Sequence, residues 1–132
     1  MGRQKKSDES LTPLELEIMN VLWRTGAANV QTVQAGLEGR SLAYTTVQTM
    51  LNVLHRKGKV KRKLKDRAYF YQPVLSQQRA AGQAIVEILD RFFDGSADRL
   101  VLNLLESQKL TKEKLAALQN LIAKNEGANH DK

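Results

Sequence analysis

The sequence predicts a mostly α-helical chain with a small β-ribbon, and three observations carry that prediction. Apolar residues recur at helical spacing in six stretches. Two short segments in the middle of the chain look like adjacent strands. Glycine and proline stand where helices and strands should end. With 132 residues, 42% of them hydrophobic, the chain suits one compact domain with a core and a smaller appended section.

The first two helices carry clear start and stop signals. Thr12 is a good N-cap, a proline takes the first helical position, and Glu15 stands three residues after the cap, which together form a capping box. Gly26 should end this helix. A second helix, capped by Asn29, should reach about Leu37. The ten polar residues before the first helix are expected to be frayed.

A third helix is predicted from about Tyr44 to Lys57. Its apolar face carries Val47, Leu51 and Leu54 at helical spacing. The opposite face carries short, neutral, hydrogen-bonding side chains instead of the Glu and Lys usual on a solvated face: Thr45, Thr46, Gln48, Thr49 and Asn52. Such side chains can contact base edges, and the Tyr44 hydroxyl can contact a phosphate. A solvated polar face is the alternative interpretation.

Two strands are predicted at about 60–64 and 68–72, with Pro73 ending the second. Three helices followed by a two-stranded ribbon is the order of a winged helix-turn-helix domain, which we place at residues 11–73.

A helical section is predicted at residues 76–124, with helices over Gln77–Phe93, over Ala97–Glu106 and from Thr111 onward. The run LVLNLL is apolar almost all round, and one short section cannot cover it. We therefore expect a homodimer through Ile85, Leu89, Phe92, Leu100, Val101, Leu102, Leu104, Leu105, Leu115, Leu118, Leu121 and Ile122. Residues 125–132, which include His130, are polar and expected to be loose.

The positive charge is confined to the first part of the chain. Residues 1–75 hold 13 Lys or Arg and 6 Asp or Glu, whereas residues 76–132 hold 8 of each. This asymmetry indicates a polyanion partner for the first part. The cations expected to straddle DNA phosphates are Arg56, Lys57, Lys61, Arg62, Lys63, Lys65 and Arg67. The alternative is an ordinary hairpin whose lysines protect an edge strand.

The composition excludes several other functions. There is no cysteine, and His55 and His130 are too few for a histidine metal cluster, so we expect neither a metal nor a cofactor. Glu15 and Glu17 point to different sides of their helix, and no catalytic motif is present, so we expect no enzyme. No apolar run approaches the roughly 20 residues of a membrane span. With no signal-peptide pattern either, we expect no membrane insertion and a cytoplasmic location.

Three strings together resemble the BlaI/MecI-type penicillinase repressor family: LTPLELEIMNVLW, LAYTTVQTMLNVLHRKGKVKRK and RAYFYQP. The resemblance covers about Leu11 to Ile122. It implies a dimeric winged-helix repressor that binds an inverted repeat in its own promoter region and in that of β-lactam-resistance genes. It also implies a membrane sensor-protease that relieves repression by cutting the C-terminal section.

In that family the cut falls at an Asn–Phe bond, in a segment that the LVLNLLE stretch resembles. The matching bond here is Asn103–Leu104, with leucine where the family has phenylalanine. The copper-responsive branch of the family carries C-terminal cysteine pairs, which this chain lacks, so copper sensing by that route is excluded.

We therefore expect a sequence-specific transcriptional repressor that acts as a homodimer on palindromic double-stranded DNA operators. The alternative is a non-catalytic adaptor whose winged helix binds another protein and whose ribbon touches nucleic acid only loosely. Competition between specific and bulk DNA distinguishes the two.

Overall fold

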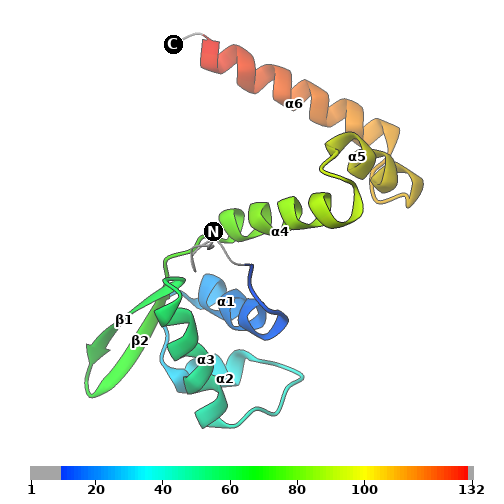
Figure 1. Cartoon of the computed structure of the whole chain (residues 1–132). Coiled ribbons are helices and arrows are strands. Elements are labelled where there is room, and N and C mark those ends of the chain that lie inside the picture. The colour runs from blue at the N-terminus through cyan, green and yellow to red at the C-terminus, as the bar shows by residue number, and fades with distance from the viewer. Residues whose placement is uncertain (1–9, 131–132) are drawn as a thin grey trace, which may run out of the picture. The chain divides into compact units, whose positions relative to one another are not determined.

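The computed structural model describes residues 10–130, with the side chains of residues 10–126. The elements follow the order α1 (Pro13–Thr25), α2 (Val30–Gly36), α3 (Tyr44–Arg56), β1 (Val60–Lys65), β2 (Ala68–Pro73), α4 (Gln77–Phe92), α5 (Ala97–Glu106) and α6 (Lys112–His130) (Figure 1). The mostly helical fold with one two-stranded antiparallel ribbon is confirmed. The chain forms two compact units, divided within α4 between Ile85 and Val86.

The capping box that opens α1 is present. The Thr12 hydroxyl accepts a hydrogen bond from the Glu15 N–H at 3.2 Å, and the Glu15 carboxylate accepts one from the Thr12 N–H at 2.9 Å. These bonds satisfy backbone donors that have no partner inside the helix. The helix ends at Gly26, whose φ of 82° lies in the left-handed region that favours glycine. The helix α2 ends at Gly36, with Leu37 as its C-cap.

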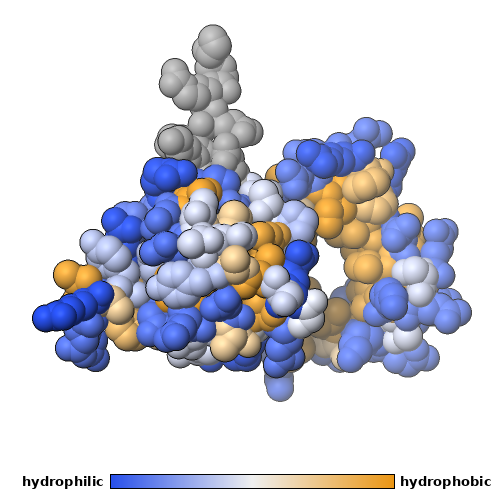
Figure 2. All heavy atoms as spheres, turned by 90° about the horizontal axis from the view of Figure 1, so that it is seen from below, coloured by the Kyte–Doolittle hydropathy of each residue, from blue (hydrophilic) through white to orange (hydrophobic). Residues whose placement is uncertain are grey.

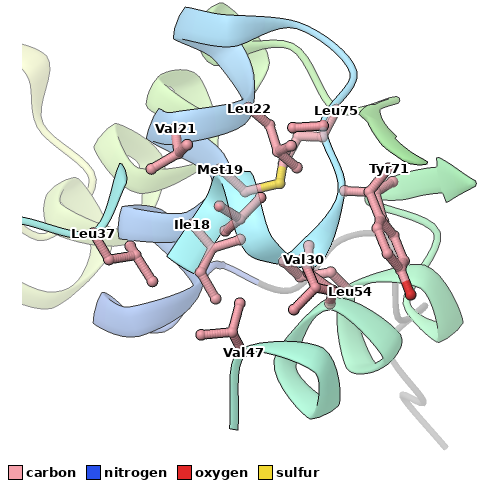
Figure 3. Packing of buried hydrophobic residues seen from close by; sticks show 14 residues of the cluster. Ile18, Met19, Val21, Leu22, Val30, Leu37, Val47, Leu54, Tyr71 and Leu75 are labelled. Carbon is pink, nitrogen blue, oxygen red and sulfur yellow. The ribbon is translucent and has the colours of Figure 1, made fainter. Parts of the chain in front are cut away.

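The hydrophobic core lies within the first unit. Figure 3 shows apolar side chains from the three helices packed against one another and against the ring of Tyr71 on β2. Ile18 and Leu22 of α1, with Leu54 of α3, are fully buried. Leu75, which follows the ribbon, also belongs to this core, and its carbonyl accepts a hydrogen bond from the Trp23 indole N–H at 2.9 Å. The core therefore extends past the predicted domain end at Pro73.

The ribbon is joined to the helices through β2. Residues Ala28 and Tyr71 exchange two backbone hydrogen bonds, of 3.0 and 2.8 Å, in an isolated antiparallel bridge. The strand β2 thus lies between the segment before α2 and the strand β1, and among residues 10–130 β1 pairs along one edge only. This arrangement fixes where the ribbon leaves the core.

The second unit contains the end of α4 together with α5 and α6, and none of its residues with described side chains is buried. Between α4 and α5 the chain turns through Asp94 and Gly95, both with positive φ, and Ser96 caps α5. The expectation of a loose tail from residue 125 was wrong for residues 125–130, which continue α6. This stretch includes Asn125, Gly127 and Asn129, which are weak helix formers, so it continues α6 because adding residues to an existing helix costs far less than starting one. Residues 1–9 and 131–132, which were also expected to be frayed or loose, lie outside the described part.

Candidate nucleic-acid interface

The helix α3 is anchored on one side and exposed on the other. Its three apolar residues at the core, Val47, Leu51 and Leu54, are fully buried. The predicted base-reading residues of its first half are all exposed: Tyr44, Thr45, Thr46, Gln48 and Thr49. We call these five residues the reading face. Because the opposite side of α3 is held by the core, the reading face projects from a rigid element.

Asn52 lies one turn beyond Gln48 but in a different environment. Its side chain is half-buried, and its amide oxygen accepts hydrogen bonds from Arg62 Nη1 and from the Tyr71 hydroxyl, both at 3.0 Å. The sequence predicted Asn52 as a base reader, but the structure engages this residue with β1 and β2. No feature of the sequence separates Asn52 from Gln48, because the distinction depends on where the ribbon packs.

The strand register divides the ribbon's cations between its two faces. Lys61, Lys63 and Lys65 lie opposite Gln72, Phe70 and Ala68, whereas Arg62 lies opposite Tyr71. Directly paired residues share a face, so the three lysines lie on the side that Tyr71 does not occupy. All three are exposed, and we call them the lysine face. Since the Tyr71 side chain enters the core, the lysine face points away from the core. Arg62 lies on the same side of the ribbon as Tyr71, which is the side of α3.

The turn of the ribbon is a two-residue loop, Asp66 and Arg67, with φ of 53° and 69°. Positive φ at both central positions is the type I′ geometry that fits the twist of the flanking strands. Arg67 is exposed, and together with Tyr44, Gln48 and Tyr69 it lines a hollow between the start of α3 and the ribbon. The tip of the ribbon therefore places a cation beside the reading face.

Two of the lysines between Arg56 and Arg67, Lys57 and Lys59, make contacts within the first unit. Lys57 forms a 2.8 Å ion pair with Glu15, whose side chain is only 2% exposed. Burial of Glu15 acts to raise its pKa, but hydrogen bonds from Lys57 and Thr12 and the Lys57 charge outweigh it, so the pKa of Glu15 lies below its usual value. Lys59 is buried, and its carbonyl accepts hydrogen bonds from the N–H groups of Val74 and Leu75. The sequence showed eight cations between Arg56 and Arg67, but not which of them would be buried or paired.

The remaining predicted DNA contact, Arg56, is exposed at the end of α3. His55 is half-buried beside it. Among residues 10–126, whose side chains the structure describes, no three His, Asp or Glu residues are grouped closely enough to hold a metal ion. None of the helices within residues 10–130 is both long and apolar enough to cross a membrane.

The predicted dimerisation residues are incompletely covered. Figure 2 shows hydrophobic surface over the helices that follow residue 86. Phe92 is 73% exposed and Leu102 is 59% exposed. Exposed apolar side chains also occur at Ile85, Leu118, Leu121 and Ile122, whereas the half-buried set is Leu89, Leu100, Val101, Leu104, Leu105 and Leu115. The second unit thus leaves a substantial apolar surface exposed.

The helix order, the reading face of α3 and the cationic ribbon together define a winged-helix protein of the class of DNA-binding transcription regulators. The penicillinase repressor family model matches residues 11–124. The chain therefore belongs to the penicillinase repressor family.

Relatives of known identity agree with this assignment. The penicillinase repressor of Bacillus licheniformis is 29% identical over 118 residues, which cover 89% of this chain and 92% of that protein. The transcriptional regulator BlaI of Mycobacterium tuberculosis is 35% identical over 94 residues, covering 70% and 68% of the two chains. Among solved structures, the transcriptional regulator Tm0710 of Thermotoga maritima has a TM-score of 0.52 at 17% identity, with 92% of this chain and 77% of that chain covered. That likeness supports the fold.

Proposed function

We propose that this chain is a sequence-specific DNA-binding transcriptional repressor and not an enzyme, and that it acts in the cytoplasm. The observation that carries the proposal is the exposed, neutral reading face of α3 beside a ribbon rich in cations. Family membership supports it, because the B. licheniformis relative is named a penicillinase repressor. The related MecI proteins are named methicillin resistance regulatory proteins, so genes of β-lactam resistance are the class of target we propose.

In this proposal the two parts of the interface have different roles. The helix α3 enters the major groove, where Gln48 can pair with adenine and Thr46 can contact bases or thymine methyl groups. The lysine face and Arg67 bind phosphates, which adds affinity without sequence preference. Repression follows because the bound protein occupies promoter DNA.

We also propose that the repressor is a homodimer on a palindromic operator. The support is the apolar surface of Phe92, Leu102, Leu118, Leu121 and Ile122, each of which is at least 40% exposed. Two linked reading helices would bind half-sites about one helical turn apart, or a multiple of it. Linking two DNA-binding units raises the effective concentration of the second unit at its half-site, so a dimer binds the operator far more tightly than a single unit does.

The family resemblance extends the proposal to relief of repression by proteolysis at Asn103–Leu104. This bond lies inside α5, where Asn103 is exposed and its carbonyl accepts a hydrogen bond from the Ser107 N–H at 3.0 Å. A membrane sensor-protease would therefore have to act on a locally opened helix. The cut would remove α6 and leave the reading face and the ribbon intact. It would therefore weaken the association of the two protomers and not the DNA contacts that each protomer makes.

The DNA-binding proposal is tested by selecting duplexes from a randomised library with the full chain. We expect one palindromic motif to be enriched. Replacing Lys61, Lys63 and Lys65 by alanine should weaken binding to selected and scrambled duplexes alike, and should flatten the salt slope by roughly 0.9 for each phosphate that is no longer neutralised. The matched control replaces Lys109, Lys112 and Lys114, which removes the same charge from the second unit. The variant Gln48→Ala should instead change the preferred sequence.

Enrichment of no motif by the wild-type chain would contradict the repressor proposal and favour the protein-binding adaptor. Sedimentation of the full chain on the selected duplex tests the dimer, and a monomer at micromolar concentration would contradict it.

The proteolysis proposal is tested by co-expression with a membrane protease encoded beside the gene, followed by addition of a β-lactam. Mass spectrometry should find a fragment that ends at Asn103. An intact chain that nevertheless leaves its operator would overturn this mode of relief.

A further inference from the structure

The side chain of Asn52 joins three elements of the first unit. Its amide oxygen accepts one hydrogen bond from Arg62 on β1 and another from Tyr71 on β2, while its backbone belongs to α3. A carbonyl oxygen has two lone pairs, so these two bonds use its accepting capacity. The Asn52 amide oxygen is therefore already hydrogen-bonded to the ribbon in the protein without DNA.

The Tyr71 hydroxyl that contacts Asn52 is held in a fixed position. Tyr71 is 2% exposed, and its backbone exchanges two hydrogen bonds with Ala28, next to the start of α2. Figure 3 shows its ring in the packed cluster, with the hydroxyl at the end away from the strand. A buried ring in a close-packed core has little freedom to move, so Asn52 is tied to a rigid anchor.

Arg62 is constrained from two directions. Its guanidinium lies over the Tyr69 ring, with the central carbon 4.2 Å from the ring centroid, and Nη1 donates to Asn52. Stacking on the ring and the hydrogen bond together limit the rotation of the guanidinium plane. Within β1, Arg62 is the cation on the side of α3, whereas Lys61, Lys63 and Lys65 lie on the other face. The remaining N–H groups of its guanidinium are donors suited to a phosphate.

We propose that Asn52 is a positioning residue that holds Arg62 as a preorganised phosphate contact at the junction of α3 and the ribbon, and that it does not read a base. This inference rests on the proposed DNA-binding function and differs from the role that the sequence suggested for Asn52. A preorganised arginine loses less conformational freedom on binding, which strengthens its contact with the DNA backbone. Because the backbone is the same for every sequence, Asn52 contributes affinity and not preference.

The test compares the wild-type chain with Asn52→Ala, Arg62→Ala and the double variant, on a duplex selected by the wild-type chain and a scrambled duplex of the same length. We expect Asn52→Ala to weaken binding to both duplexes about threefold to tenfold. The ranking of single-base variants of the selected duplex should stay unchanged. The double variant should bind no more weakly than Arg62→Ala, since Asn52 acts through Arg62. Both single variants should flatten the salt slope, which a purely structural role would not do.

A second pair of variants keeps the inference testable if Asn52→Ala does not fold. Asn52→Asp keeps an oxygen that accepts from Arg62 and Tyr71 but removes the amide donor that adenine recognition requires. Gln48→Glu makes the same charge change on the reading face. We expect Asn52→Asp to retain the wild-type sequence preference and Gln48→Glu to lose it.

A change of the preferred base at one position with Asn52→Ala or Asn52→Asp, when Arg62→Ala causes none, would overturn the inference. Unchanged binding of a folded Asn52→Ala variant would also overturn it. Either result leaves the DNA-binding proposal in place, because that proposal fails only if the wild-type chain selects no sequence.

Discussion

Both units of this chain are built mainly from helices, but they differ in what they bury. The first unit buries apolar residues from α1, α2, α3 and the ribbon in one cluster. The second unit, in the part with described side chains, buries none and exposes Phe92, Leu102 and Leu121 by more than half. Apolar content alone therefore does not show whether a segment makes its own core. The first unit buries a core made of its own residues, whereas the second unit leaves apolar surface exposed, as binding surfaces do.

The largest expected difference between the units comes from leucine truncation. Leu51→Ala removes a fully buried side chain and should lower the free energy of unfolding by about 2–5 kcal/mol. Leu121 is 56% exposed, so Leu121→Ala should change the unfolding of the first unit by no more than about 0.5 kcal/mol, and should weaken self-association instead. Urea unfolding followed by circular dichroism, together with sedimentation, measures both. Equal destabilisation by the two variants would contradict the comparison.

A second prediction concerns where the first unit ends. A fragment that stops at Ile85 retains Leu75 and the acceptor of the Trp23 indole, whereas a fragment that stops at Pro73 lacks both. Removal of the buried leucine and the hydrogen bond should lower the free energy of unfolding by about 2–4 kcal/mol. Fluorescence of Trp23, which is the chain's one tryptophan, reports the transition directly. Identical unfolding midpoints would show that residues beyond the ribbon add nothing to this core.

A third prediction concerns the buried carboxylate of the first unit. The folded state lowers the pKa of Glu15, so its contribution to stability is present above the ordinary glutamate value of 4.5 and is lost as the pH falls below it. Glu15→Gln should cost about 1–3 kcal/mol at neutral pH and reduce the acid sensitivity of unfolding.

The control for this change is Glu17→Gln on the same helix. Glu17 pairs with Arg40 at 2.7 Å, but both side chains are more than a third exposed. That substitution should cost about 1 kcal/mol or less. A cost for Glu17→Gln as large as that for Glu15→Gln would show that burial is not the reason for the Glu15 effect.

The last prediction compares two glycines whose replacement should have opposite effects. A Cβ on Gly36 would lie 2.8 Å from Val21 Cγ1, so Gly36→Ala should destabilise the first unit by about 1–3 kcal/mol. A Cβ on Gly82 in α4 meets nothing within 4 Å, so Gly82→Ala should stabilise its helix by about 0.5–1 kcal/mol. Thermal unfolding of the two variants should therefore shift in opposite directions. A gain in stability for Gly36→Ala would mean that α1 and α2 can move apart at little cost.

Local signals in the sequence determined most of the elements and the reading face of α3. Thr12 and Glu15 specify the start of α1, and the spacing of Val47, Leu51 and Leu54 shows which side of α3 is buried. These features depend on neighbours within a few residues along the chain, which a sequence displays directly. The motif strings were also sufficient to indicate the penicillinase repressor family, to which the chain belongs.

Only the tertiary structure decided how individual polar residues are used. Lys57 reaches Glu15 across 42 positions of sequence, and Asn52 meets Arg62 and Tyr71 because the ribbon packs beside α3. The strand register, not the charge count, separates Arg62 from the lysine face. Such contacts form when segments distant in sequence pack together. Polar side chains such as those of Asn and Lys can bind another part of the protein as well as they can bind DNA. Their roles follow from packing and burial, which composition and spacing do not encode.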